Sequence, residues 1–338
     1  MPRTTPFHER LHALNQTGLW KDWSGYVVAP QFQYSATLEY YAVRNAASIF
    51  DTTPLFKYHV TGTDARALLE RVFLRNIGAC AVGRSQYTVW CDEEGYVLQD
   101  GVVLHVADDE YWVTSAEPTL HYFREVARDR GLADVSIEDV TDAYGILALQ
   151  GPHAHDVLAR LTSDVAPLRY FGCTQTQIGS RPVVVSRTGY TGDLGYELWI
   201  RAADALDVWD ALWEAGRAYN LTPIGNTTLK MTRVEAGLLL MGADFHTSRF
   251  AWVPAQKETP LELGWGWMLR KLDDDDRDFV GRAAIEAQLE SGSSRWTTVG
   301  LGVDWRDYDR VYGDAGIVPP LHEVYSESTM SIYRRGTK

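Results

Sequence analysis

Hydrophobic and polar positions along the chain predict strands and helices that follow one another. Residues 56–62 alternate between apolar and polar side chains, which is typical of a strand with one buried face. Residues 64–74 have apolar side chains at helical spacing, and Asp64 stands where a helix N-cap is expected. The pattern therefore predicts a strand followed directly by a helix.

Three further strands and a second helix are predicted next. Residues 85–115 contain apolar runs that are interrupted by turn residues at 92–95 and 107–110, which indicates three strands. Residues 116–131 predict a helix with a proline in its first turn and Gly131 at its end.

This order of elements returns about 89 residues later. The segment that begins at Thr61 is similar to the segment that begins at Gln150, and residues 110–132 agree with residues 196–221 in element order and spacing. We therefore predict two similar α+β units, each with two helices packed on an antiparallel sheet. Neither unit has a Gly-x-Gly-x-x-Gly segment that opens a helix after a strand, which argues against a dinucleotide-binding fold.

Composition and charge narrow the classes of function. The 338 residues carry a formal net charge of −13 without a basic run, so nucleic acids and anionic membranes are not expected partners. No segment reaches the roughly 20 apolar residues of a membrane span, and the N-terminus lacks a signal-peptide core. The three cysteines are scattered, and His153 and His155 stand only two apart, so we predict no metal site and a cytoplasmic protein.

The segment 186–199 contains three glycines, Gly189, Gly192 and Gly195, between two predicted strands. Glycine permits positive φ angles and close approach of the backbone. A phosphate-binding loop would need a helix N-terminus directly after it, and here a strand follows. The segment is therefore a structural loop or one wall of a pocket.

Glu197 favours the pocket. It lies in an apolar run whose alternation places Tyr196, Leu198 and Ile200 on one face and Trp199 on the other. An ionised carboxylate in such surroundings needs hydrogen-bond donors. A flat heterocycle with two adjacent N–H groups, such as a 2-aminopyrimidinone, would supply two parallel donors.

Six segments resemble motifs of the glycine cleavage T-protein (aminomethyltransferase) family and follow the order of those motifs. Members of this family are folate-dependent one-carbon transferases. The sequence SRTGYTGDLGYE is similar to the signature of that family. Together the segments span about residues 45–285, and the chain is identified as a member on their combination. They are residues 49–65, 87–104, 147–158, 186–197, 233–245 and 259–285.

The resemblance implies an α+β fold: a T-protein-like cloverleaf of three domains around a channel that holds tetrahydrofolate. The expected domains are a first, folate-binding α+β domain over residues 1–50 plus 140–290, and a second α+β domain over residues 51–139. A partial β domain is expected over residues 291–338, because family members continue further and the C-terminal β-barrel would be incomplete here.

The resemblance also implies a catalytic residue, Asp100. Family members have a carboxylate at this position beside the reactive folate nitrogens, where it orients the cofactor and can hold or accept a proton. The family usually has a second aspartate directly before it, and this chain has Gln99 there. The alternative role for Asp100 is to cap a tight turn before the next strand.

Further residues are implied to contact folate. Glu197 matches the carboxylate that binds the pterin ring, and Tyr190 matches a tyrosine that contacts the cofactor. Leu55 and Tyr87 are expected to line the folate site. His59 is a candidate for substrate binding, although a single histidine on a strand is commonly structural.

Two departures from the family pattern concern the one-carbon donor. Leu229 and Lys230 stand where Arg-Asp is usual, and Thr53-Pro54 stands where Ser-His is usual. Lys230 can still meet the glutamate tail of folate as a point charge. Arg233 either contacts the cofactor or forms an ion pair with Glu235 that holds domains together, and we favour the ion pair.

The departures favour a small N-, O- or S-methylated donor, with an aminomethyl-lipoyl carrier protein as the other partner that the family implies. Two other functions remain open: a folate-binding protein without transferase activity, and a folate module that acts with a separate flavin-dependent demethylase. Relatives of the first kind have a cysteine motif where residues 277–285 contain no cysteine.

Overall fold

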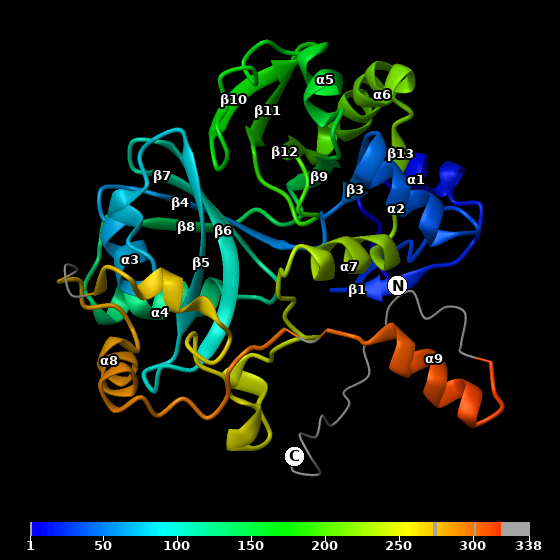
Figure 1. Cartoon of the computed structure of the whole chain (residues 1–338). Helices are drawn as coiled ribbons and strands as arrows, with labels where there is room; N and C mark the ends of the chain where they lie inside the picture. The colour runs from blue at the N-terminus through cyan, green and yellow to red at the C-terminus, as the bar shows by residue number, and fades with distance from the viewer. Residues whose placement is uncertain (1, 273–275, 301, 319–338) are drawn as a thin grey trace. The chain divides into compact units, whose positions relative to one another are not determined.

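The computed structural model describes residues 2–272, 276–300 and 302–318 (Figure 1). The chain divides into two compact units, residues 1–297 and residues 298–338. The first unit contains a six-stranded sheet, a five-stranded sheet and a two-stranded hairpin.

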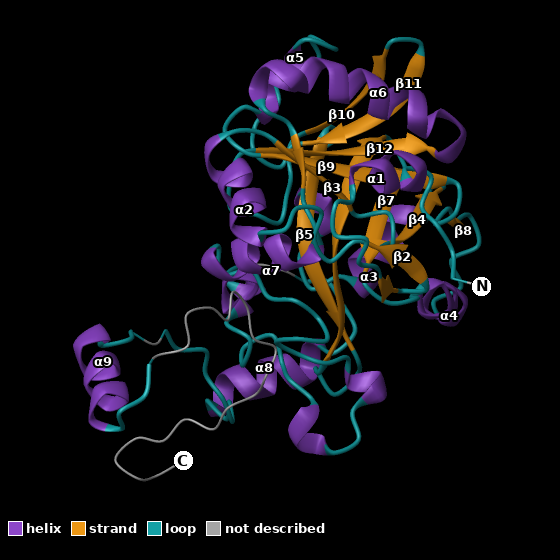
Figure 2. Cartoon of the chain, turned by 90° about the vertical axis from the view of Figure 1, so that its right-hand side faces the viewer, coloured by secondary structure: helices purple, strands orange, loops and turns teal. Residues whose placement is uncertain are grey.

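The six-stranded sheet has the strand order β10-β11-β12-β9-β3-β13 (Figure 2, with β13 labelled in Figure 1). All neighbours pair antiparallel except β13, which pairs parallel with β3. The strands are β3 (Ser48–Asp51), β9 (Tyr144–Gln150), β10 (Cys173–Ile178), β11 (Arg181–Ser186), β12 (Gly195–Arg201) and β13 (Thr222–Pro223).

Helices cover one face of this sheet, because alternate strand residues are apolar and bury their side chains on that side. The helices are α1 (His8–Leu14), α5 (Ala154–Ala159) and α6 (Ala205–Gly216). Tyr196, Leu198 and Ile200 of β12 lie in the core beneath them, as their alternation predicts. Glu197 and Trp199 therefore point to the opposite face.

The five-stranded sheet has the order β5-β6-β7-β4-β8 and is antiparallel throughout. One face packs on α3 (Ala65–Val72) and α4 (Leu120–Asp129), around a core that includes Tyr58, Trp90 and Phe123 (Figure 1). The strands are β4 (Phe56–Thr61), β5 (Arg84–Cys91), β6 (Val97–Ala107), β7 (Glu110–Ser115) and β8 (Ser136–Asp139).

The predicted strands and helices of this region are confirmed, except that Pro118 precedes the N-cap Thr119 of α4 instead of lying in its first turn. Asp64 is the N-cap residue of α3, but its side chain does not cap the helix. Its Oδ2 instead accepts a hydrogen bond of 2.9 Å from the amide of Asp134, which ties the start of α3 to the loop before β8.

The helix-free faces of the two sheets contact each other. Trp112 of β7 and Trp199 of β12 meet edge to face with ring centroids 5.5 Å apart, within a cluster that also contains Leu104 and Ile146. Apolar residues on these faces therefore join the sheets, while polar residues on the same faces can border the space between them.

One lysine binds two of the segments that connect the sheets, the one before β4 and the one after β8. Lys57 is fully buried, and its Nζ donates hydrogen bonds to the carbonyl oxygens of Thr53 at 2.7 Å, Leu55 at 2.8 Å and Thr141 at 3.2 Å. Burial lowers the pKa of Lys57 to about 8, against the opposing effect of nearby Asp51.

Residues 239–285 pack on the five-stranded sheet. Phe245, Trp265 and Phe279 bury their rings against Val89 and Cys91 of β5. The aromatic side chains of this segment thus bury on the sheet of residues 56–139. The expected division into residues 1–50 plus 140–290 and residues 51–139 stays a prediction. Helix α8 (Arg282–Ser291) ends the segment.

Two helices and a hairpin lie beside the edge of the six-stranded sheet. They are α2 (Ala36–Asn45), α7 (Asn226–Glu235), β1 (Lys21–Trp23) and β2 (Tyr26–Val28). The buried carboxylate of Glu39 accepts hydrogen bonds from the amides of Phe32 at 2.6 Å and Gly225 at 2.7 Å. Glu39 thereby fixes the N-terminus of α7 to α2, where a negative charge is favourable.

The second unit contains helix α9 (Trp305–Asp314) in its described residues. Asp304 caps this helix by accepting bonds from the amides of Arg306 and Asp307. Residues 292–300 and 302–318 contain no strand, so the β-type pieces expected there are not found. The remaining pieces, after residue 318, lie outside the described residues.

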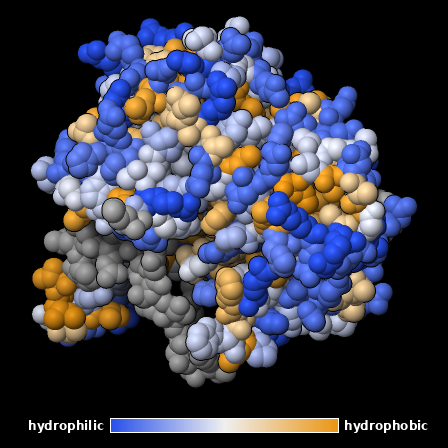
Figure 3. All heavy atoms as spheres, turned by 180° about the vertical axis from the view of Figure 1, so that it is seen from behind, coloured by the Kyte–Doolittle hydropathy of each residue, from blue (hydrophilic) through white to orange (hydrophobic). Residues whose placement is uncertain are grey.

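The face of the molecule in Figure 3 is predominantly hydrophilic, with apolar side chains exposed at several places. Single exposed apolar residues of this kind are ordinary on folded proteins. Among the residues that the structure describes, no helix has the length and apolar character needed to cross a membrane.

Candidate functional site

Asp100 lies on β6 and is held by Tyr87 of β5. The Tyr87 hydroxyl donates a hydrogen bond of 2.8 Å to Oδ2 of Asp100. Both residues remain partly accessible, yet burial raises the pKa of Asp100 to about 6 against the opposing effect of the Tyr87 hydroxyl. A carboxyl group with this pKa exchanges protons near neutral pH, as a general acid or base must.

Tyr190 brings the glycine-rich loop to this pair. Burial, then the Asp100 charge, then Tyr190 raise the pKa of Tyr87, so the two tyrosines lie near each other. The hydroxyl of Tyr190 donates a hydrogen bond to the carbonyl oxygen of Leu239. Leu239 and Tyr87 pack against the same apolar cluster, so Tyr190 ties the glycine-rich loop to the neighbourhood of the Tyr87–Asp100 pair.

Glu197 lies on β12, on the face without helices. Its Oε2 accepts a hydrogen bond from the Thr188 hydroxyl, which also contacts the Ser186 hydroxyl at 2.6 Å. In the described part of the chain the Thr188 hydroxyl is the side-chain donor to Glu197, so the carboxylate keeps further acceptor capacity. Burial raises its pKa, with Thr188 opposing.

Apolar side chains surround Glu197. Ala148 of β9 is its register partner, and Phe50 of β3 is the register partner of Ala148. Phe50 stacks with Trp23 at a centroid distance of 6.1 Å, and Leu229 packs against the same cluster. A planar ligand with N–H groups at one edge fits a carboxylate beside such a surface, since it satisfies the charge and covers the rings.

Gln150 explains two of the loop glycines. A Cβ atom on Gly189 would lie 2.0 Å from Gln150 Oε1, and a Cβ on Gly195 would lie 2.2 Å from it. The amide of Gln150 occupies the space between them and accepts a hydrogen bond of 3.0 Å from the Thr191 hydroxyl. The glycines thus admit a buried side chain that shapes the loop.

Arg44 of α2 holds the outside of the same loop. Its guanidinium donates to the carbonyl oxygen of Thr191 at 2.8 Å, to Asp193 at 2.8 Å and to Glu235 of α7 at 2.7 Å. The loop is therefore positioned from within by Gln150 and from outside by Arg44.

Basic residues lie at the α7 edge of this region. The pKa of Lys230 is lowered to about 8 by burial and by the charges of Lys21 and Arg233. Burial also lowers the pKa of Lys21. Neighbouring cations that disfavour each other's charge are stabilised by a bound anion, so this edge suits a carboxylate.

The favoured ion pair between Arg233 and Glu235 is not the pairing in the structure. Arg233 is 2% exposed and forms an ion pair with Asp244, and it also donates a hydrogen bond of 3.1 Å to the carbonyl oxygen of Leu238. Glu235 instead pairs with Arg44. Residues two apart on a helix point in different directions, which separates Arg233 from Glu235.

Two other candidates lie away from the recorded contacts of Asp100 and Glu197. Leu55 is partly exposed in the turn between β3 and β4. His59 of β4 contacts Glu110 at 3.0 Å, and its ring lies 4.7 Å from that of Trp112. His59 is therefore part of the contact between the sheets.

Two hollows lie elsewhere on the molecule. A hollow of about 620 Å³ is lined by Trp112, Tyr144, Trp199 and residues of β10 and β11, and a smaller one of about 100 Å³ lies near Gln99. Neither is lined by Asp100 or Glu197. Among the described residues, no group of three His, Cys, Asp or Glu side chains could hold a metal ion.

Comparisons with known proteins agree with this fold. Residues 7–272 match the family model described as the GCVT N-terminal domain. The chain is 35% identical over 307 residues to an aminomethyltransferase of Saccharopolyspora erythraea, across 90% of this chain and 80% of that protein. It is 33% identical over 325 residues to a trimethylamine-oxide aldolase of Ruegeria pomeroyi, across 93% of this chain but 39% of that protein.

A solved structure shows the same fold. The crystal structure of the glycine cleavage system aminomethyltransferase T from Bartonella henselae superposes with a TM-score of 0.75 at 21% identity. The match covers 86% of this chain and 76% of that chain.

Proposed function

We propose that this chain, a one-carbon transferase of the GCVT N-terminal domain family, uses tetrahydrofolate as the acceptor of the one-carbon unit. In this proposal Glu197 binds the pterin ring and Asp100 lies beside the reacting nitrogens. The observation that carries the proposal is the Glu197 carboxylate. It is recessed, bordered by Phe50 and Trp23, and engaged by a single side-chain hydroxyl among the described residues.

The donor and acceptor inventory supports this assignment. The 2-amino and N3–H groups of a pterin form two parallel donors, which a carboxylate accepts in bidentate geometry. The Thr188 hydroxyl uses one site on Oε2 and leaves others. The cluster of Lys21 and Lys230 would meet the glutamate carboxylates at the other end of the cofactor.

Asp100 is suited to hold or release a proton during transfer. When bound, tetrahydrofolate supplies the nitrogen atoms that take up the one-carbon unit. Tyr87 fixes Oδ2 of Asp100, so Oδ1 is the oxygen left to face the reacting atoms. Because its pKa is about 6, Asp100 is mostly ionised at pH 7 and can accept a proton there.

The donor is either a small N-, O- or S-methylated compound or an aminomethyl-lipoyl carrier protein. Leu229 supports the first class, because it makes the wall beside Glu197 apolar where the resemblance leads us to expect an arginine. The aminomethyltransferases among the relatives support the second class.

Titration of tetrahydrofolate against wild type, Glu197→Gln and Glu110→Gln tests the pterin site. We expect Glu197→Gln to weaken binding at least about tenfold, since the amide presents a donor to a donor. Glu110→Gln is the matched control, because Glu110 is also a strand carboxylate but contacts His59. Unchanged affinity in Glu197→Gln would contradict the proposal.

A donor screen tests the reaction. Methylated amines, aryl methyl ethers, dimethylsulfonium compounds and aminomethyl-lipoyl carrier protein are each incubated with tetrahydrofolate and either wild type or Asp100→Asn. We expect wild type to turn over one donor class, and we expect Asp100→Asn to lose this turnover. Folate binding without turnover of any donor would favour a non-catalytic folate-binding protein.

A further inference from the structure

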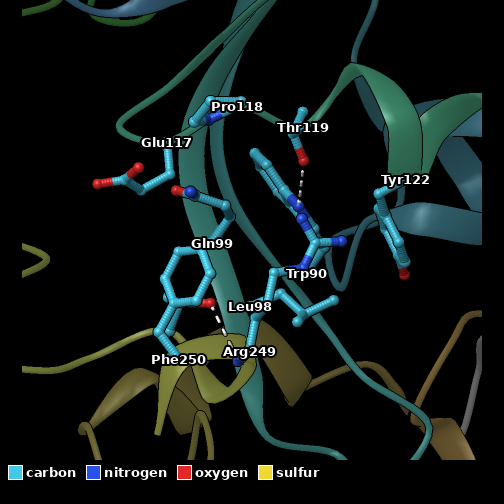
Figure 4. A pocket seen from close by; sticks show the side chains of 10 residues that line it. Trp90, Leu98, Gln99, Glu117, Pro118, Thr119, Tyr122, Arg249 and Phe250 are labelled. Atoms are coloured by element: carbon cyan, nitrogen blue, oxygen red, sulfur yellow. Dashed lines mark hydrogen bonds between the residues drawn. The ribbon is translucent and has the colours of Figure 1, made fainter. Parts of the chain in front are cut away.

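A cavity of about 100 Å³ lies on the helix-covered side of the five-stranded sheet, between the N-terminus of α4 and the short helix η4 (Ser248–Phe250) (Figure 4). It opens on the face of β6 opposite to the face that carries Asp100. Its volume is several times the roughly 10–15 Å³ that one water needs, so it has room for a small molecule.

Gln99 points into this cavity. Gln99 lies on the same face of β6 as Val103, which packs beneath α3 and α4. Asp100 lies on the same face as Leu104, which packs between the sheets. Gln99 is 4% exposed, and its Oε1 is buried without a hydrogen-bond partner in the described structure. An unpaired buried amide oxygen is costly, so the site gains free energy from a ligand that donates to it.

Two opposite charges line the same cavity. Burial raises the pKa of Glu117, and within the described ranges its carboxylate has no recorded hydrogen bond or ion pair. The guanidinium of Arg249 likewise has no recorded partner there. Figure 4 shows the Gln99 amide and the Glu117 carboxylate pointing the same way, while the Arg249 side chain extends toward Trp90.

The other polar groups of the wall are already satisfied. The Trp90 indole donates a hydrogen bond of 3.2 Å to the Thr119 hydroxyl, and the Tyr122 hydroxyl donates one of 3.1 Å to the carbonyl oxygen of Cys91. The rings of Trp90 and Tyr122, together with that of Phe250, provide the apolar surface. Such rings also favour a cation by cation–π attraction.

We propose that this cavity is an accessory binding site for a small amino-acid zwitterion. Gln99 Oε1 and the Glu117 carboxylate accept hydrogen bonds from the ammonium group, and Arg249 pairs with the carboxylate group. The ligand must keep at least one N–H, so glycine and its N-methylated derivative fit, and quaternary amines do not.

The site is independent of the proposed folate site, because Gln99 and Asp100 face opposite sides of one strand. Isothermal titration of glycine, methylammonium and acetate into the 338-residue chain tests it, with wild type, Glu117→Gln, Arg249→Ala and Glu125→Gln compared. Glu125 is the control, since it lies on α4 outside the cavity and pairs with Arg128.

We expect saturable binding of glycine, weaker binding of methylammonium and acetate, and a loss of at least about tenfold in Glu117→Gln and Arg249→Ala but not in Glu125→Gln. Gln99→Leu is expected to abolish glycine binding while leaving the ligand-free protein at least as stable as wild type, because it removes the unpaired oxygen.

Three outcomes would overturn the proposal. They are the absence of saturable glycine binding to wild type, equal binding to Glu117→Gln, and displacement of glycine by tetrahydrofolate in wild type but not in Glu197→Gln. The last result would place glycine in the folate site. Failure of tetrahydrofolate to bind would contradict the proposed function and leave the glycine titration unaffected.

Discussion

The hydroxyl of Tyr87 donates a hydrogen bond of 2.8 Å to Oδ2 of Asp100. This contact opposes the effect of burial, which raises the pKa of Asp100 to about 6. Tyr87 therefore positions the proposed catalytic carboxylate and also lowers the pH at which it ionises.

Tyr87→Phe is expected to move the acidic limb of the pH–rate profile to higher pH by about one unit, because the lost hydrogen bond favoured the ionised form. The profile of tetrahydrofolate-dependent turnover measures the shift. Tyr111→Phe is the control, since Tyr111 is buried in the same sheet and its ring lies 4.4 Å from that of His105. A lower rate without a shift would show that Tyr87 only shapes the pocket.

Asp100→Asn is expected to stabilise the fold relative to wild type as pH rises. The folded-state pKa of Asp100 is about 6, above its ordinary 3.8, so the folded protein binds this proton more tightly than the unfolded chain does. Wild type therefore loses stability between about pH 4 and 6, on the order of 2–3 kcal/mol, and Asp100→Asn does not.

Urea unfolding at pH 4, 6 and 8 compares the two proteins. The unfolding free energy of Asp100→Asn minus that of wild type should rise with pH up to pH 6 and stay constant at higher pH. A difference that does not change with pH would mean that the Asp100 carboxyl is not perturbed by burial.

Gly189→Ala is expected to destabilise the protein by about 1–3 kcal/mol and to weaken folate binding, because the new Cβ would lie 2.0 Å from Gln150 Oε1. In a Gln150→Ala background the same change should cost much less, since the obstructing amide is gone. Thermal unfolding of the four proteins gives the coupling free energy. Gly266→Ala is the control, because a Cβ there meets its neighbour at an ordinary 3.4 Å.

Lys230→Ala is expected to weaken tetrahydrofolate binding about tenfold but to leave binding of reduced pteroate, which lacks the glutamate, nearly unchanged. Because the pKa of Lys230 is about 8, the difference in tetrahydrofolate affinity between wild type and Lys230→Ala should be largest below pH 7 and should diminish above pH 8. The exposed Lys271 provides a control substitution. Equal losses for both ligands would place the glutamate elsewhere.

The regular elements could be predicted from the sequence because their signals are local. The alternation of Tyr196, Leu198 and Ile200 specifies both the strand β12 and its buried face. The turn at 92–95 separates β5 from β6 as its residue types indicate. Alternation also places Glu197 on the face opposite the core.

The contacts that shape the site are long-range, and the sequence does not reveal them. Gln150 enters a loop almost forty positions later in the chain, and Arg44 reaches Asp193 and Glu235 from a helix far before both. The glycines at 189 and 195 indicate close approach of some group, but not which one. Gln99 resembles a mere substitution for a second carboxylate, and only the sheet geometry shows that it faces a different cavity.

The lysine at the crossing between the sheets has a consequence for how the protein unfolds. Lys57 Nζ binds carbonyl oxygens of residues 53 and 55 on the way into the five-stranded sheet and of residue 141 on the way out. The entry and exit of the inserted sheet are thereby closed by one side chain. We infer that unfolding of one sheet breaks the Lys57 hydrogen bonds that hold the segments connecting it to the other. The two sheets should therefore unfold in a single cooperative transition, although each has its own core.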